Sequence, residues 1–124
     1  MANINITIKN MAEIRAAFAK APRLTVSALN KAIQQSIFTI ERDSKRNTPV
    51  DTGFLRASHR TLFSNLRGEV SPTADYAVFV HDGTRYMRPR RFLLEAVQAD
   101  EPKVQRYFED AVQGVLDQIA RDAS

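Results

Sequence analysis

The chain has 124 residues, of which 44% are hydrophobic and 26% charged, and its formal net charge at pH 7 is +4. This length suits one domain with its own core, so we expect a single domain over residues 1–124. The absence of cysteine excludes disulfide frameworks, thiolate metal sites and cysteine nucleophiles. No window approaches the roughly 20 apolar residues that a membrane helix needs. The moderate basic excess permits nucleic-acid contact without requiring it.

The N-terminal third predicts a strand followed by two helices. Isoleucines alternate with polar residues over 4–8, which is the period of a half-buried strand. Asn10 then stands at the cap position of a helix that ends near Lys20. Pro22 suits the first turn of a second helix of about 25 residues, because a first-turn N–H has no partner inside the helix. Its apolar stripe consists of Val26, Leu29, Ile33, Ile37 and Ile40.

This long helix is expected to be the backbone of the fold, because it exceeds the usual length of a globular helix. We expect its apolar stripe to face a sheet of the same chain. Packing of part of the stripe on another subunit is the alternative.

The stretch 48–56, Thr-Pro-Val-Asp-Thr-Gly-Phe-Leu-Arg, ends the long helix and opens the next region. Pro49 lacks an N–H and pushes the residue before it out of helical geometry. Asp51 and Thr52 can each cap a new turn through a side-chain oxygen. Gly53 allows a backbone conformation that other residues resist. We therefore interpret these four residues as scaffold rather than as a binding site.

Two strands and a short helix are expected next. Residues 60–64 and 69–73 predict an antiparallel hairpin, because the segment between them carries Asn and Gly. Such a hairpin is marginal alone and needs the long helix or the N-terminal strand to cover it. Asp75 can then cap a short helix that Gly83 ends. A strand over this last segment is the alternative, since Val78 and Val80 alternate.

The C-terminal third predicts two helices. Residues 92–99 form the first, and Asp100 caps the second with Pro102 in its first turn. One face of the second helix is apolar, with Val104, Phe108, Ala111, Val112, Val115 and Ile119. Together the elements predict an α+β domain, in which a small antiparallel sheet packs against the long helix of the N-terminal half, with C-terminal helices beyond.

The densest charge cluster is the segment 85–91, which has four arginines in seven residues, with a tyrosine and a methionine between them. Arginine recognises phosphates and carboxylates, and tyrosine stacks. The cluster therefore fits an acidic protein partner, a nucleic acid or a solvated loop without a partner. We expect an interaction loop made of Arg85, Tyr86, Met87, Arg88, Arg90 and Arg91.

Catalytic constellations are not evident. His59 and His81 have no second histidine at helical spacing, so we interpret them as surface or packing residues. A two-metal nuclease site would need carboxylates that the spacing gives no reason to bring together; the candidates are Asp51, Glu69, Asp75 and Asp82. The four glycines are scattered and form no phosphate loop. We therefore expect no enzyme, no cofactor and no metal site.

Three stretches in order resemble one protein family. Residues 48–56 are similar to the Pro-Val-Asp-Thr-Gly-x-Leu-Arg signature of tailed-phage proteins like HK97 gp10. Residues 76–84, Tyr-Ala-Val-Phe-Val-His-Asp-Gly-Thr, are similar to that family's Tyr-Ala-x-x-Val-Glu-x-Gly-Thr. Residues 87–93 resemble its basic, Met-containing loop and Pro-Phe-Leu helix start. The resemblance spans about 22–98. Within the second stretch, three residues match the family pattern and are assigned to the structural motif: Tyr76, Gly83 and Thr84.

The chain departs from this pattern at two places. His81 stands where the family usually has Glu, so an ion pair made by that Glu is altered or moved here. Arg90 and Arg91 replace the usual small residue and Pro before Phe-Leu, which changes the expected conformation of the loop.

The resemblance implies a structural virion protein, without enzymatic activity, at the junction of phage head and tail. It implies a neck or tail-completion component that contacts head-closure or connector proteins and tail proteins, and that forms a homo-oligomeric ring when assembled. A monomer in solution that assembles only on its target also fits. The implied location is the virion, with assembly in the host cytoplasm. The alternative function is a small basic nucleic-acid-binding protein.

Overall fold

The computed structural model describes residues 11–49 and 53–122. The strand expected over 4–8 and the Asn10 cap lie outside the described residues. The elements, in chain order, are α1 (Met11–Lys20), α2 (Pro22–Asn47), α3 (Phe54–Ala57), β1 (His59–Ser64), β2 (Arg67–Pro72), α4 (Ala77–Asp82) and α5 (Phe92–Asp122). Two long helices and a two-stranded antiparallel sheet make an α+β fold, which confirms the predicted class.

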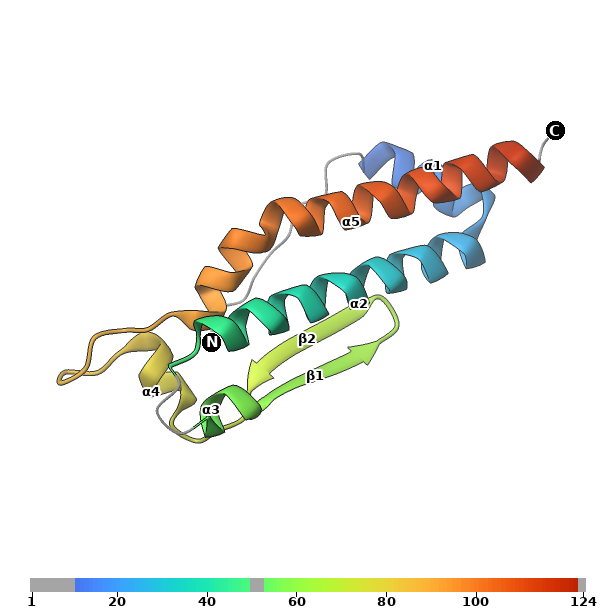
Figure 1. Cartoon of the computed structure of the whole chain (residues 1–124). Coiled ribbons are helices and arrows are strands. Elements are labelled where there is room, and N and C mark those ends of the chain that lie inside the picture. The colour runs from blue at the N-terminus through green and yellow to red at the C-terminus, as the bar shows by residue number, and fades with distance from the viewer. Residues whose placement is uncertain (1–10, 50–52, 123–124) are drawn as a thin grey trace.

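Helices α2 and α5 lie antiparallel and form the frame of the molecule (Figure 1). Near the end of α2, the Asn47 amide donates to the Phe92 carbonyl oxygen at 3.3 Å. Two turns earlier in α2 and farther along α5, the hydroxyls of Thr39 and Tyr107 lie 3.0 Å apart. The long helix predicted from Pro22 is confirmed, and it begins with that proline at its first turn.

Helix α2 packs against the rest of the chain through two faces, and the apolar stripe in the sequence predicted only one of them. Ile33 and Ile37, from the predicted apolar stripe, lie against the hairpin at Gly68. A second face, toward α5, carries small and hydroxyl-bearing residues, which allow the two helices to approach closely. Its buried members are Thr25, Ala32, Ser36 and Thr39. Each hydroxyl is satisfied by the carbonyl oxygen four residues earlier in the chain, so the face is polar in composition but fully bonded.

The hairpin is tighter than the sequence predicts. Strand β2 begins at Arg67 rather than at residue 69, and β1 and β2 are joined by Asn65 and Leu66 alone. Leu66 has a φ of 56°, and its N–H donates to the side-chain oxygen of Asn30 on α2 at 2.7 Å. Gly68 therefore belongs to the strand and not to the turn.

The reason for glycine at position 68 is the close approach of β2 to α2. A Cβ placed there would lie 2.7 Å from the Ile33 Cγ2 and from the Ile37 Cγ1. These carbons branch at or near Cβ and have little freedom to move aside. The absence of a side chain thus lets the hairpin lie on the helix.

The prediction of two C-terminal helices is wrong. One continuous helix, α5, runs from Phe92 to Asp122 with Pro102 inside it, and Figure 1 shows it bent in its first third. A proline in a helix interior removes one hydrogen bond and favours such a bend. The helix continues because its first turns carry core residues, among them Phe92, Leu93 and Ala96. Asp100 is therefore a buried residue of a helix interior and not a cap.

Asp100 forms a carboxyl pair with Asp43 across the two long helices. The Asp100 side chain is 2% exposed, and its Oδ2 accepts no hydrogen bond from any described residue. Burial, together with the neighbouring Asp43, raises the pKa of Asp100 to about 6. Burial opposes the ionisation of Asp43, but the hydrogen bond from Asp100 and the Arg42 guanidinium lower its pKa overall. Of the two carboxyl groups, Asp100 is therefore the one that holds a proton at mildly acidic pH, below its pKa of about 6.

The surrounding charges are cationic on both helices. On α2, Arg42 Nε lies 3.2 Å and Arg46 Nη1 3.6 Å from Asp43 Oδ1. On α5, Lys103 Nζ lies 3.8 Å from Asp100 Oδ1. These cations lower the pKa of Asp43, while the burial of Asp100 raises the pKa of that residue.

The pair predicts a pH dependence of stability. The folded state holds the Asp100 proton more tightly than the unfolded state, in which the pKa is near 3.8. The contribution of Asp100 to stability should therefore fall as pH rises from about 4 to about 7, by up to about 3 kcal/mol, while the lowered pKa of His59 acts in the opposite sense. The lowered pKa of Asp43 acts in the opposite sense, but only below its ordinary value. Asp100→Asn keeps a donor to Asp43, so urea unfolding should show the fall abolished in this variant.

The control for this prediction is Asp110→Asn, which changes an exposed carboxylate of the same helix. It should keep the wild-type pH profile. Equal slopes for wild type and Asp100→Asn between about pH 4 and about pH 7 would contradict the assignment of the shared proton.

Two glycine substitutions test the packing of the hairpin on α2. Gly68→Ala should lower the free energy of unfolding by about 1–3 kcal/mol, because the added methyl group meets Ile33 and Ile37. Gly114→Ala is the matched control, since nothing lies within 4 Å of a Cβ there and the site is an exposed helix position. It should raise the free energy of unfolding by about 0.5–1 kcal/mol. Similar effects of both substitutions would show that β2 does not approach α2 this closely.

Candidate interaction surface

The short helix α4 ends as the sequence predicts, at Gly83. This glycine has a φ of +80°, and a Cβ on it would lie 2.8 Å from the Pro89 nitrogen and 3.0 Å from the Met87 carbonyl oxygen. Glycine is required at this position for two reasons: φ is left-handed, and the following loop passes too close to leave room for a Cβ. The expected Asp75 cap is not formed: Tyr76 is the cap residue, and no side-chain hydrogen bond caps the helix.

The loop that follows, 84–91, is braced at its turn and at its base. Thr84 and Met87 exchange backbone hydrogen bonds of 2.9 and 3.2 Å, which closes a tight turn around Arg85 and Tyr86. At the base, the Arg90 N–H donates to the Val80 carbonyl oxygen of α4 at 2.9 Å. The loop extends away from the helices at the end of the molecule (Figure 1). Thr84 thus closes the turn at the start of the loop.

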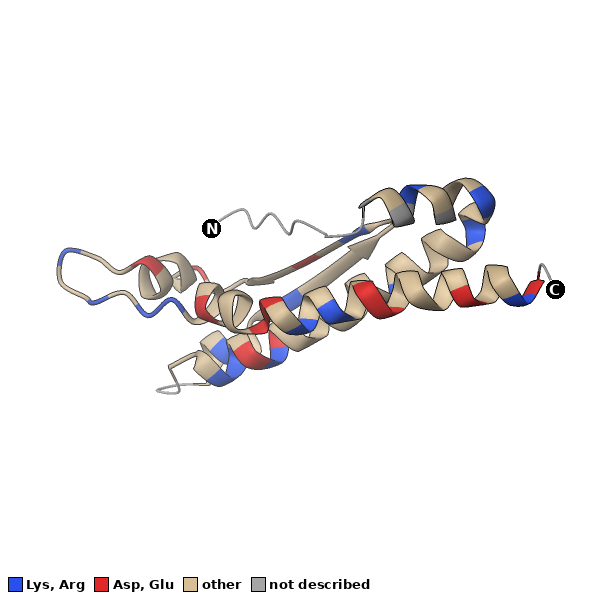
Figure 2. Ribbon diagram, turned by 90° about the horizontal axis from the view of Figure 1, so that it is seen from above, with Lys and Arg blue, Asp and Glu red and all other residues tan. Residues whose placement is uncertain are grey.

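The arginines of this loop are exposed, and no ion pair to them is found within the described ranges. Figure 2 shows their positions along the loop in blue. Tyr86 is 91% exposed at the tip. The Arg85 guanidinium carbon lies 5.9 Å from the centre of the Tyr86 ring, within the range of a cation–π contact. We call Arg85–Arg91 the arginine loop; it presents its positive charge directly to solvent.

His81 fastens α4 to the start of α5. Its Nε2 accepts a hydrogen bond from the Leu94 N–H at 3.2 Å, so the ring proton sits on Nδ1 and is donated to Asp82 Oδ1 at 2.8 Å. Leu94 lies in the first turn of α5, where N–H groups lack helical partners. The bond from His81 lowers the pKa of Asp82. The family pattern has Glu at position 81. In this chain the residue at that position is His81, which is hydrogen-bonded to Asp82.

His59 is a second buried packing residue. Its Nε2 lies 2.8 Å from the Ser44 hydroxyl, and its Nδ1 lies 3.0 Å from the Arg56 carbonyl oxygen. Burial lowers the pKa of His59. The rings of His59 and His81 both meet the Phe92 ring edge to face, at 5.7 and 5.2 Å between centroids. The Ser44–His59 pair resembles a nucleophile and its base, but both side chains are buried, so its evident role is to hold β1 against α2.

The first motif forms the turn between α2 and α3. Helix α2 ends at Asn47, and Thr48 is extended with a ψ of 134°, as expected before Pro49. Gly53 has a φ of +69°, as its position predicts. The roles expected for Asp51 and Thr52 fall outside the described residues. The Arg56 side chain also donates to the Lys45 carbonyl oxygen at 2.9 Å, so α3 is tied to the end of α2.

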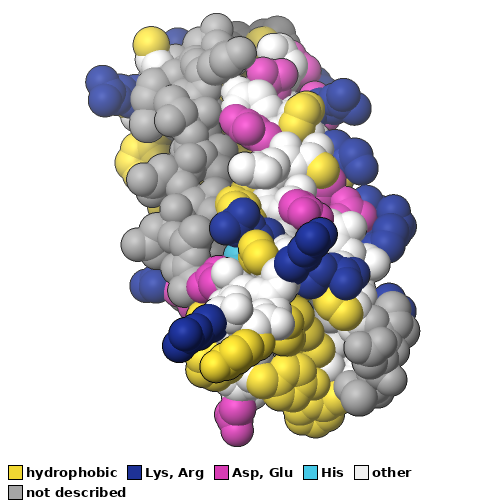
Figure 3. Space-filling view, turned by 90° about the vertical axis from the view of Figure 1, so that its left-hand side faces the viewer, with side chains coloured by type: hydrophobic (Ala, Val, Ile, Leu, Met, Phe, Trp, Pro, Cys, Tyr) yellow, Lys and Arg dark blue, Asp and Glu magenta, His cyan; other side chains and the backbone are white. Residues whose placement is uncertain are grey.

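Beside the arginine loop lies an apolar surface that sequence reasoning missed. Phe54, Tyr76 and Phe79 expose 61%, 40% and 57% of their area, and we call them the aromatic patch. The rings of Phe54 and Tyr76 lie 6.2 Å apart, and Phe79 is one helical turn from Tyr76. Figure 3 shows hydrophobic side chains gathered at the lower end of this face, with Lys and Arg above them. The signal was present in the pattern of α4, whose opposite side carries the buried Ala77 and His81.

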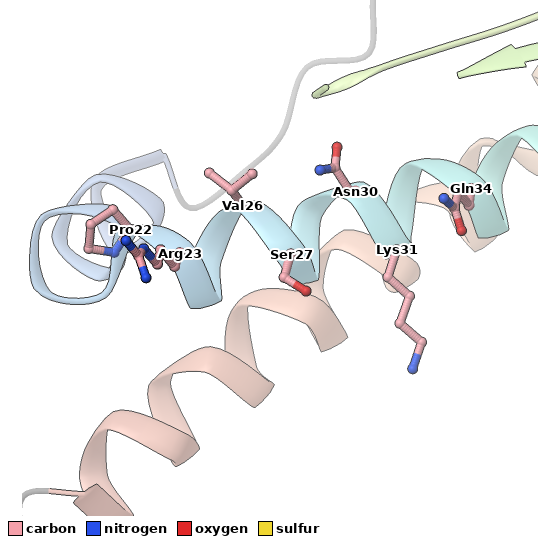
Figure 4. Close-up of a pocket in the computed structure, with 7 residues that line it drawn as sticks. All are labelled: Pro22, Arg23, Val26, Ser27, Asn30, Lys31 and Gln34. Carbon is pink, nitrogen blue, oxygen red and sulfur yellow. The ribbon is translucent and has the colours of Figure 1, made fainter. Parts of the chain in front are cut away.

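Other surface features offer less chemistry. A hollow on α2, shown in Figure 4, has all its lining residues on that one helix, between Pro22 and Gln34, so it is an open groove. Among the described residues, no group of His, Cys, Asp and Glu is placed to hold a metal ion. No described helix combines the length and apolar character needed to cross a membrane.

Comparison with known proteins finds one family. The family described as "Bacteriophage HK97-gp10, putative tail-component" matches residues 12–83, which is more than half of the chain. No curated protein and no solved structure matches. The matched range contains the first motif and the second as far as Gly83. The arginine loop and α5 lie beyond it, so the match is shorter at its C-terminal end than the expected 22–98. The chain belongs to the HK97 gp10-like family of phage tail components.

Proposed function

We propose that this protein is a structural component of a tailed-phage or prophage virion, a neck or tail-completion protein at the head–tail junction. It acts as a single domain over 1–124 through protein–protein contacts, without catalysis or a cofactor. The observation that carries the proposal is the braced, exposed arginine loop, displayed at one end of a chain of this family. A loop held by its own hydrogen bonds presents a contact surface at a low entropic cost of binding.

The proposed partners are head-closure or connector proteins and tail proteins. Copies of the chain form a ring in the virion through heterologous contacts, in which one face meets a different face of the next copy. The chain is synthesised and assembled in the host cytoplasm. A monomer in solution that enters the ring only at its target is compatible with this proposal.

A protein partner is favoured over a nucleic acid by the charges near the loop. Asp75 precedes α4 and Asp82 is its last residue, and both are exposed in the segment that leads to the arginine loop. These carboxylates would repel a phosphate backbone, but they suit a protein surface of mixed charge. Phosphate-driven binding to DNA or RNA, if present, would weaken steeply between about 50 and about 200 mM salt. The proposal expects no such binding at low salt to duplex or single-stranded oligonucleotides.

The proposed contact is tested by charge reversal in the loop. Arg88→Glu with Arg90→Glu should reduce the yield of joined particles at least about tenfold, because the repulsion acts at a contact of several charges. The measurement is complementation of a phage defective in this gene, with joined and unjoined heads and tails counted by electron microscopy. Arg23→Glu with Arg106→Glu is the matched control, since both residues are exposed on the long helices. Normal joining by the loop variant would overturn the assignment.

A further inference from the structure

The aromatic patch is exposed although neighbouring residues of the same short helices are buried. In α3, Leu55 is buried while Phe54 faces solvent. In α4, Ala77 and His81 face the core while Phe79 does not. Aromatic side chains bury about 150–250 Å² each when covered. Exposed rings grouped in this way mark a surface that another molecule covers.

The patch and the arginine loop form one continuous surface. The loop leaves α4 at Gly83, and it returns to α4 through the bond from the Arg90 N–H to the Val80 carbonyl oxygen. The exposed Met87 lies in the same loop. A molecule that covers the rings must therefore approach the arginines, for which no ion pair is found in the described part of the chain. Complementarity then requires apolar side chains for the rings and carboxylates for the arginines.

A second copy of this chain fits that requirement poorly. Two of its other exposed apolar side chains, Phe18 and Leu62, lie next to basic residues. Phe18 is two residues from Lys20, and Leu62 shares the outer face of β1 with Arg60. Across the hairpin, Glu69 is already paired with Arg67. Docking these surfaces on the aromatic patch would bring arginines toward arginines.

We propose that the aromatic patch and the arginine loop together dock an acidic, apolar segment of a different virion protein. The inference rests on the proposed function and names the chemistry of the partner. Large apolar side chains of that segment cover Phe54, Tyr76 and Phe79. Its carboxylates meet Arg85, Arg88, Arg90 and Arg91.

The test uses a library of random peptides selected for binding to the full chain. Peptides that also bind the double variant Phe79→Ser/Arg88→Glu are then removed, and the remaining peptides are sequenced. Enriched peptides should combine aspartate or glutamate with phenylalanine, leucine or other large apolar residues. The best peptide should lose at least about tenfold in affinity with Phe79→Ser and with Arg88→Glu, as is usual for central contact residues.

Matched controls separate the patch from the general surface. Leu62→Ser removes an exposed apolar side chain from the outer face of the hairpin, and Arg106→Glu reverses an exposed charge on α5. Both should leave the affinity within about twofold of wild type, because these side chains lie outside the proposed surface. Thermal unfolding should show that all four variants fold, since every substituted side chain is exposed.

Three outcomes would overturn the inference. The first is enrichment of basic or wholly polar peptides, or a selection in which the counter-selection on the double variant removes every bound peptide. The second is self-association of the chain, measured by light scattering, that Phe79→Ser abolishes; the occupant is then a second copy. The third is oligonucleotide binding that the patch variants abolish. If any of these occurs while charge reversal in the loop still blocks particle joining, the proposed function stands and only the partner chemistry is wrong.

Discussion

The close antiparallel packing of α2 on α5 is the constraint on which the rest of the structure depends. It requires small or internally bonded side chains on the facing side of α2, and it buries the carboxyl group of Asp100 near the partly exposed Asp43. Ionising both carboxyl groups at once is unfavourable here, so the pKa of Asp100 is raised to about 6. The same interface tolerates Pro102 inside α5, because the core residues before and after it keep the helix in place.

The two helices fix the geometry of the end of the molecule that carries the candidate surface. The end of α2 holds α3 and β1 through Arg56 and His59, and the first turn of α5 holds α4 through His81. Phe92, between the two histidine rings, joins both sets of contacts. The arginine loop and the aromatic patch are therefore displayed from elements with buried anchors, as a contact surface with preset geometry requires.

Much of the fold could be predicted from local signals. Pro22 and Pro49 mark the ends of α2, and the Asn- and Gly-containing segment marks the hairpin, because backbone restrictions act locally. Gly68, Pro102 and Asp100 were misread because their roles depend on packing between distant segments: glycine meets α2, proline is held by the core, and the aspartate is buried by the partner helix. Of the candidate surface, the arginine loop was visible as a charge cluster. The aromatic patch was not, because exposure is decided by which side of α4 meets the core.

The central claim is that the arginine loop contacts protein in the assembled particle. The most direct measurement replaces Tyr86, at the exposed tip of the loop, with photoreactive benzoylphenylalanine and illuminates purified particles. The same replacement of Leu62 serves as the control on the outer face of the hairpin. The account predicts a crosslink from position 86 to another virion protein. Crosslinks from position 86 to DNA alone, or crosslinks to virion proteins from position 62 alone, would contradict it.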